Sequence, residues 1–225
     1  MTYLPEQPPQ PQQAAAGYYP APAFVPDPPK NLTVLGVLAF GTASLATLFH
    51  LVTATIAGRA LRNLDAEELD WSVAAYAIGS ALGGLALLAG WITGSMWLFR
   101  ARKNAERINP GGLFVRSPGW AWGGWICPIV SLWFPFQVVR DTHRAVARHF
   151  SPTLIGWWWG LFLLMSVGGR IASQAGDDAT AADASAIQGA ETFFALVMLV
   201  TLVLWGLVLR RTTREQHDTL YGRNA

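Results

Sequence analysis

The sequence carries little charge and almost no cysteine. Only 13% of its 225 residues are Asp, Glu, Lys or Arg, and its mean hydropathy is +0.29. Soluble domains carry about 25% charged residues, so this composition predicts an integral membrane protein. The single cysteine, Cys127, excludes an internal disulfide, and no Cys/His cluster indicates a zinc site.

Sequence motifs of catalysis are also missing. There is no HExxH, no GxSxG, no glycine-rich phosphate loop and no carboxylate pair with a nearby nucleophile. We therefore expect no enzymatic activity and no cofactor or metal. Basic residues and tryptophans do occur together, but they follow the predicted membrane boundaries, so we expect no nucleic-acid partner.

The N-terminal segment differs in composition from the rest. Residues 1–30 hold nine of the fourteen prolines, which predicts a disordered tail rich in Pro, Gln and Ala. No cleavable signal peptide is visible, so the first apolar run is expected to remain as an anchor. A helical membrane domain at 31–212 and a short tail at 213–225 complete the predicted organisation.

Four apolar runs are long enough to cross the hydrocarbon core as helices, which takes about 20 residues. They lie at residues 32–57, 72–99, 153–173 and 187–209. The predicted fold class is therefore an all-α integral membrane protein with four transmembrane helices. A fifth apolar segment, 118–139, either crosses the membrane or enters and leaves on one face.

Loop charges distinguish these two topologies. If 118–139 crosses, giving five spans, the Lys and Arg residues outside the spans divide nine to six between the two sides. If it is re-entrant or interfacial, they divide thirteen to two. Because basic residues concentrate on the cytoplasmic side, the second topology is favoured, with both termini cytoplasmic. Five spans remain the alternative.

The chemistry of 118–139 also favours a bent segment. Pro128 and Pro135 would each break a helix interior, and tryptophans prefer the membrane interface. Beyond Pro135, three arginines recur every fourth residue, as on one face of an interfacial helix. The candidate surface for lipid, including anionic lipid, or for a partner comprises Trp120, Trp122, Trp125, Pro128, Trp133, Pro135, Arg140, Arg144 and Arg148.

Two further features lie within the predicted spans. His50, Arg170 and Glu191 fall towards the external ends of their helices and form a candidate intramembrane polar cluster, with Arg170 able to approach Glu191. Small residues four apart at 79–94 form a face that lets another helix approach closely. Packing within one chain and homodimerisation are the two interpretations of that face.

The stretch from residue 109 to residue 141 contains Asn109-Pro110, Pro118-Gly119-Trp120, Trp125, Pro128-Ile129, Leu132, Pro135 and Asp141. On these residues it resembles a bacterial membrane family catalogued as domain of unknown function 4328. That resemblance implies helical architecture and a membrane location, and it implies no activity, substrate or site. Ser131 and Cys127 stand where the resemblance leads us to expect an asparagine and an apolar residue.

These observations lead to two functional hypotheses for a multi-pass protein of the bacterial plasma membrane. The first is a non-enzymatic scaffold or sensor that acts at the cytoplasmic leaflet through residues 118–150. The alternative is a channel or small-solute transporter in which 118–139 forms a pore or gating element. Against the alternative, no polar residue is placed at mid-membrane in the four predicted spans.

Overall fold

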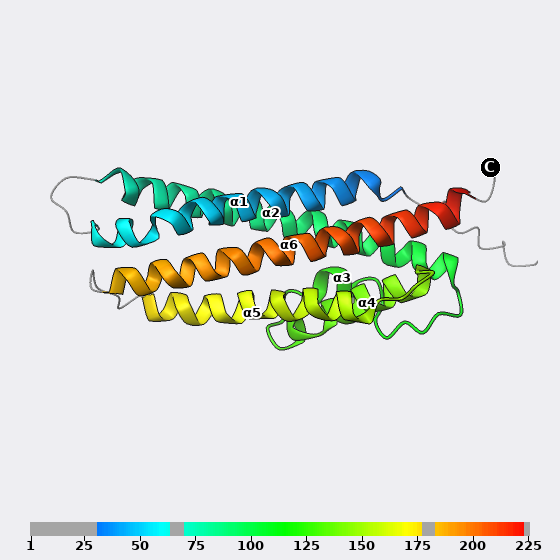
Figure 1. Cartoon of the computed structure of the whole chain (residues 1–225). Helices are drawn as coiled ribbons and strands as arrows, with labels where there is room; N and C mark the ends of the chain where they lie inside the picture. The colour runs from blue at the N-terminus through cyan, green and yellow to red at the C-terminus, as the bar shows by residue number, and fades with distance from the viewer. Residues whose placement is uncertain (1–30, 64–69, 177–182, 223–225) are drawn as a thin grey trace, which may run out of the picture.

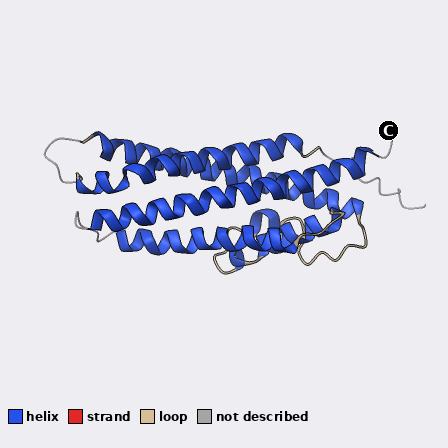
Figure 2. Ribbon diagram, in the orientation of Figure 1, coloured by secondary structure: helices blue, strands red, loops and turns tan. Residues whose placement is uncertain are grey.

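A computed structural model describes residues 31–63, 70–176 and 183–222, without the side chains of residues 170–176. Within these ranges the chain forms helices and no strand, which confirms the predicted all-α class (Figure 2). The predicted disordered tail at 1–30 lies outside the described residues, as do residues 223–225 of the predicted C-terminal tail.

Four long helices form an elongated bundle (Figure 1): α1 Thr33–Arg62, α2 Trp71–Ile108, α5 Pro152–Gly176 and α6 Ala184–Tyr221. Each contains one of the predicted apolar runs, but α2 and α6 continue well beyond theirs. The residues that follow those two runs include many strong helix formers, such as Ala, Arg, Lys, Glu and Gln. Helix α2 ends where Asn109 precedes Pro110, because a residue before proline disfavours helical geometry.

Three of these helices have the character of membrane spans. Among the described residues, α1, α2 and α6 are long and apolar enough to cross a membrane. This supports a membrane protein on length and composition. The fourth span, which the sequence places in α5, remains a prediction.

Small residues allow α2 to pack closely on α1. A Cβ atom at Gly79 would lie 2.6 Å from Thr53 Cγ2, and one at Gly83 would lie 3.3 Å from Phe49 Cβ. A Cβ atom at Gly84 would meet nothing within 4 Å. The predicted small-residue face at 79–94 is therefore partly used within the chain, and homodimerisation through it remains a prediction.

The chain between α2 and α5 turns back on itself. It contains α3 Trp120–Gly123, the 3-10 helix η1 Val130–Leu132 and α4 Phe134–Val146. In Figure 1 this segment leaves the end of α2, runs part of the way along the bundle, and returns to the same end before α5 begins. We refer to this end, where α2 and α6 also end, as the basic end.

The two prolines account for the breaks in this segment. Pro135 lies in the first turn of α4, where its missing N–H costs no intrahelical hydrogen bond. Pro128 lies just before η1, in a stretch without regular helix. A single straight helix through 118–139 would place both prolines in its interior, at about 3 kcal/mol each.

The main apolar core lies in the half of the bundle that contains this segment. All four long helices contribute to it, and α3 and α4 fill the space against α2, α5 and α6. The members at most 2% exposed are Ala39, Trp97, Leu98, Ala101, Ala121, Val138, Val139, Ile155 and Val208. The segment is thus an integral part of the fold and not an appended loop.

The α1–α2 packing predicts opposite outcomes for two substitutions on one helix. Gly79→Ala should lower the melting temperature, because Thr53 is held by hydrogen bonds to its own helix and overpacking costs about 1–3 kcal/mol. Gly84→Ala should leave it unchanged or slightly higher. Thermal melting of the protein in detergent, followed by tryptophan fluorescence, measures both. Equal melting temperatures for the two variants would contradict this packing.

Candidate functional site

A buried carboxylate of α4 binds the loop that precedes α3. The side chain of Asp141 is only 1% exposed, and its Oδ2 accepts a hydrogen bond of 3.0 Å from the backbone N–H of Val115. Its Oδ1 lies 2.8 Å from Arg140 Nη2 and 3.9 Å from Arg144. Asp141 therefore joins one loop and two arginines at a single buried point.

A buried arginine holds the same loop from α2. The Arg102 side chain is 2% exposed and forms an ion pair of 3.0 Å with Glu106. It donates a 2.8 Å hydrogen bond to the carbonyl oxygen of Arg116, and its guanidinium lies 3.6 Å from the ring centre of Phe114. We refer to Arg102, Arg116 and Asp141 as the loop-anchoring cluster.

Arg116 completes this cluster by contacting the start of α4. Its Nε donates a 2.9 Å hydrogen bond to Gln137 Oε1, and its guanidinium lies 3.6 Å from the ring centre of Phe134. The loop at 109–118 is thus fixed to α2 through Arg102 and to α4 through both Asp141 and Arg116. Together these contacts hold the two ends of the returning segment side by side.

His143 joins α4 to α6 beside this cluster. Its side chain is buried, and Nδ1 lies 3.0 Å from Thr212 Oγ1. Burial lowers the pKa of His143 below its usual value, opposed by the charge of Glu215 and aided by that of Arg211. The neutral imidazole is therefore favoured in the folded protein.

The predicted lipid or partner surface divides into an inner and an outer part, and most of its aromatic members lie on the inner side. Trp120 meets Phe134 edge-on at 4.5 Å, and Trp122 meets Trp91 in the same way at 5.8 Å. Trp125 donates to the carbonyl oxygen of Ala121 and packs beside α5. Pro135 is buried.

The outer part is a short apolar stretch at the bend of the segment, which we call the hairpin tip and define as residues 126–133. Pro128 and Trp133 of the predicted surface are exposed here, and so is Cys127. Ile126 is 73% exposed and Ile129 is 68% exposed. Such a concentration of exposed apolar side chains is typical of a surface that contacts lipid or a partner.

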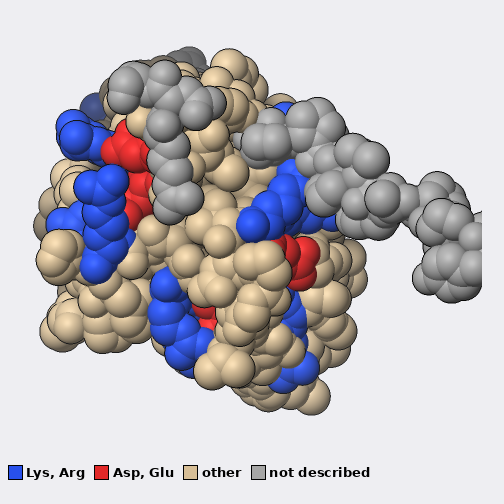
Figure 3. Space-filling view, turned by 90° about the vertical axis from the view of Figure 1, so that its right-hand side faces the viewer, with Lys and Arg blue, Asp and Glu red and all other residues tan. Residues whose placement is uncertain are grey.

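The sequence places Arg140, Arg144 and Arg148 on one helical face, but the structure does not leave all three side chains free for a ligand. Arg140 is largely engaged by Asp141, and Arg144, 43% exposed, donates to the carbonyl oxygen of Leu113. Arg148 is exposed, and its backbone N–H donates to Glu215. Figure 3 looks onto the basic end and shows Lys and Arg side chains in several groups around it, with acidic side chains beside some of them.

The predicted intramembrane polar cluster is partly brought together near the opposite end. His50 Nε2 lies 3.7 Å from Glu191 Oε2. Tyr76 donates a 3.1 Å hydrogen bond to Glu191 Oε1 and was not predicted as a member. The side chain of Arg170 lies outside the described residues, so its predicted approach to Glu191 remains a prediction.

Sequence reasoning also missed the loop-anchoring cluster as a site. Asp141 is one of the residues on which the family resemblance rests, and Arg102 is one of the loop charges counted for the topology, but neither pattern predicts a site. A signal for Arg102 exists, because Leu98, Ala101 and Ala105 on the same helical face are apolar and become buried. No group of three or more His, Cys, Asp or Glu side chains in the described ranges could hold a metal ion.

Comparison with known proteins identifies one match. The family model described as Domain of unknown function (DUF4328) matches residues 60–217. The matched range covers most of the chain, from the end of α1 to the last turns of α6, and includes the whole returning segment. Neither a search of curated proteins nor a search of solved structures found a match.

The loop-anchoring cluster predicts a large effect of removing one carboxylate. Asp141→Ala should destabilise the protein by about 1–3 kcal/mol, because it removes the acceptor of two partly buried hydrogen bonds, from the Val115 N–H and from the Arg140 guanidinium. Asp218→Ala is the matched control: Asp218 pairs with Arg214 at 3.8 Å on the surface, and such pairs contribute about 0–1 kcal/mol. Melting in detergent measures both, and equal shifts would contradict the assigned role of Asp141.

Proposed function

This chain belongs to the family described as Domain of unknown function (DUF4328), and we propose that it is a multi-pass membrane protein acting at the cytoplasmic leaflet. In this proposal the chain crosses the bacterial plasma membrane four times, and 118–139 is re-entrant. Both termini are cytoplasmic, and the protein is a non-enzymatic scaffold or sensor. Residues 118–150 are the part that engages lipid or a partner.

The support for this topology is the agreement between helix direction and charge. The starts of α1 and α5 and the ends of α2 and α6 lie at one end of the bundle (Figure 1). Most of the described Lys and Arg residues lie in the C-terminal parts of α2 and α6 or in and beside α4, whereas Arg59 and Arg62 lie in the last turn of α1 at the other end. Positive charge on the cytoplasmic side would orient the basic end inward.

The observation that carries the proposed role is the hairpin tip. Its exposed apolar side chains belong to a segment whose other face is fixed by the loop-anchoring cluster and by aromatic packing. A firmly anchored hairpin with an apolar tip and arginines near its base suits insertion into the headgroup region of an anionic leaflet. The aromatic filling of its inner face weighs against a pore through 118–139.

The proposal predicts that anionic lipid gathers around the hairpin. A fluorophore on Cys127, the single cysteine, reports on the tip in nanodiscs. Phosphatidylglycerol with brominated chains should quench it more than brominated phosphatidylcholine at the same mole fraction. Arg144→Gln combined with Arg148→Gln should bring the ratio of quenching towards one, since each basic residue contributes about 1 kcal/mol near an anionic surface.

A charge-matched pair at the other end provides the control. Arg59→Gln combined with Arg62→Gln removes the same charge from the end of α1 and should preserve the preference. Equal quenching by the two lipids in the unmodified protein would contradict engagement of an anionic leaflet. Absence of quenching by either lipid would contradict insertion of the tip into the hydrocarbon region.

A further inference from the structure

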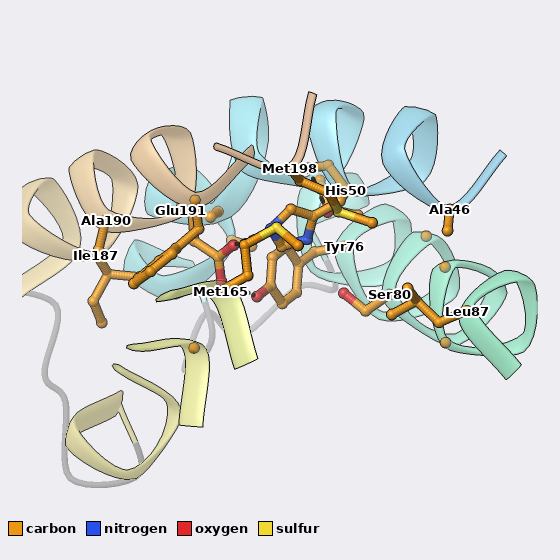
Figure 4. Close-up of a pocket in the computed structure, with 18 of the residues that line it drawn as sticks. Ala46, His50, Tyr76, Ser80, Leu87, Met165, Ile187, Ala190, Glu191 and Met198 are labelled. Carbon is orange, nitrogen blue, oxygen red and sulfur yellow. Dashed lines mark hydrogen bonds and ion pairs between the residues drawn. The ribbon is translucent and has the colours of Figure 1, made fainter. Parts of the chain in front are cut away.

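A cavity of about 840 Å³ lies between the two helix pairs, towards the end opposite the basic end. It is lined by α1, α2, α5 and α6, and Figure 4 shows side chains from these elements gathered around it. Its volume falls within the range of small-molecule binding sites, about 300–1,000 Å³. This cavity is separate from the hairpin and has no role in the function proposed above.

The cavity exists because α2 and α5 do not pack closely against each other. Helix α2 packs on α1, whereas α5 packs on α6. Only 6% of the apolar stretch of α2 is buried, against 28% for α1 and α6, so α2 is the least covered of the candidate spans. Gly84 and Gly169 line the cavity, and a Cβ atom at either would meet nothing within 4 Å.

The cavity is apolar along most of its length. On α2 its lining runs from Val73 to Leu87, about 21 Å along the helix axis at 1.5 Å per residue. Phe162 and Met165 contribute from α5, and Met198 from α6. Methionines adapt to irregular ligands, so this lining suits a flexible hydrocarbon chain.

The polar groups of the cavity converge on one carboxylate. Glu191, 26% exposed in its side chain, accepts a hydrogen bond from Tyr76, and His50 lies 3.7 Å from its other oxygen (Figure 4). A carboxylate near the edge of a membrane needs donors or a cation to offset its desolvation. The described neighbours supply one phenolic hydrogen bond and no permanently charged group, which leaves carboxylate lone pairs available to a ligand.

We propose that this cavity binds a single-chain amphiphile with a protonated amine head group. The ammonium would donate to the Glu191 carboxylate beside Tyr76 and His50. The hydrocarbon chain would extend between α2 and α5, past Gly84 towards Leu87. A ligand of this class could enter sideways from the bilayer, because the space between α2 and α5 is not closed by helix packing.

Photo-crosslinking in nanodiscs tests this proposal directly. The probe is dodecylamine with a diazirine at the end of its chain, and dodecanol with the same diazirine is the neutral comparison. The amine should label α2 and α5 saturably, with competition by unlabelled dodecylamine, and the alcohol should label them at least about tenfold more weakly. This difference is expected because the alcohol can still donate a hydrogen bond to the carboxylate but carries no positive charge to pair with it.

Three variants locate the site. Glu191→Gln preserves the side-chain size and an acceptor for Tyr76, and it should weaken amine labelling about tenfold. Gly84→Leu should abolish labelling by filling the cavity from a position with open space. Gly41→Leu, at an exposed glycine of α1 that also meets no atom within 4 Å, should retain it. Melting curves establish that each variant is folded before it is labelled.

Two results would overturn the proposal. Equal labelling by amine and alcohol would mean that the cavity has no preference for a cation. Unchanged amine labelling in folded Glu191→Gln would mean that the carboxylate is not the binding group, as expected if Arg170 occupies it. Neither result affects the leaflet proposal, since the hairpin and the fluorophore at Cys127 lie elsewhere.

Discussion

The buried carboxylate of Asp141 is the interaction on which the returning segment depends. It accepts a hydrogen bond from the loop before α3 and an ion pair from α4 itself, so it fixes both arms of the hairpin to each other. Burying a carboxylate is costly, and removing either partner leaves an uncompensated charge. Once the loop is fixed, α4 must run back towards the basic end, and α5 must begin there.

The two ends of the bundle are therefore built differently. At the basic end, α3 and α4 fill the space between the long helices with aromatic and aliphatic side chains. At the other end the described part of the chain places no such insertion between α2 and α5, and a cavity lined by the Glu191 carboxylate remains. The insertion of α3 and α4 between the long helices thus explains why the half of the bundle at the basic end is filled and the other half contains a cavity.

Much of the fold was predictable because hydrophobicity and proline act locally. The apolar runs gave the long helices, and Pro128 and Pro135 predicted the break in the fifth segment. Helices α2 and α6 continue beyond their predicted spans, because helix formation does not stop where hydrophobicity stops.

The candidate site was harder to predict because burial of polar groups depends on distant partners. Arg140 and Asp141 are adjacent in sequence, yet one is half-exposed and the other buried, and that difference follows from Val115 in another part of the chain. Tyr76 joined the Glu191 cluster for the same reason. Some tryptophans of the returning segment lie inside the protein and others on its surface. Which of them are buried depends on how α2 and α5 pack against the segment, and periodicity does not predict that packing.

The central claim is that residues 118–139 enter and leave the membrane on the same face. Thiol labelling at positions before and after this segment tests it most directly. In a Cys127→Ser background, Ser117→Cys and Arg148→Cys place exposed thiols before α3 and after α4. A membrane-impermeant maleimide should reach both from the cytoplasmic face, and Arg62→Cys at the end of α1 only from the external face. Reaction of positions 117 and 148 from opposite faces would mean that the segment crosses the membrane, and would contradict the account.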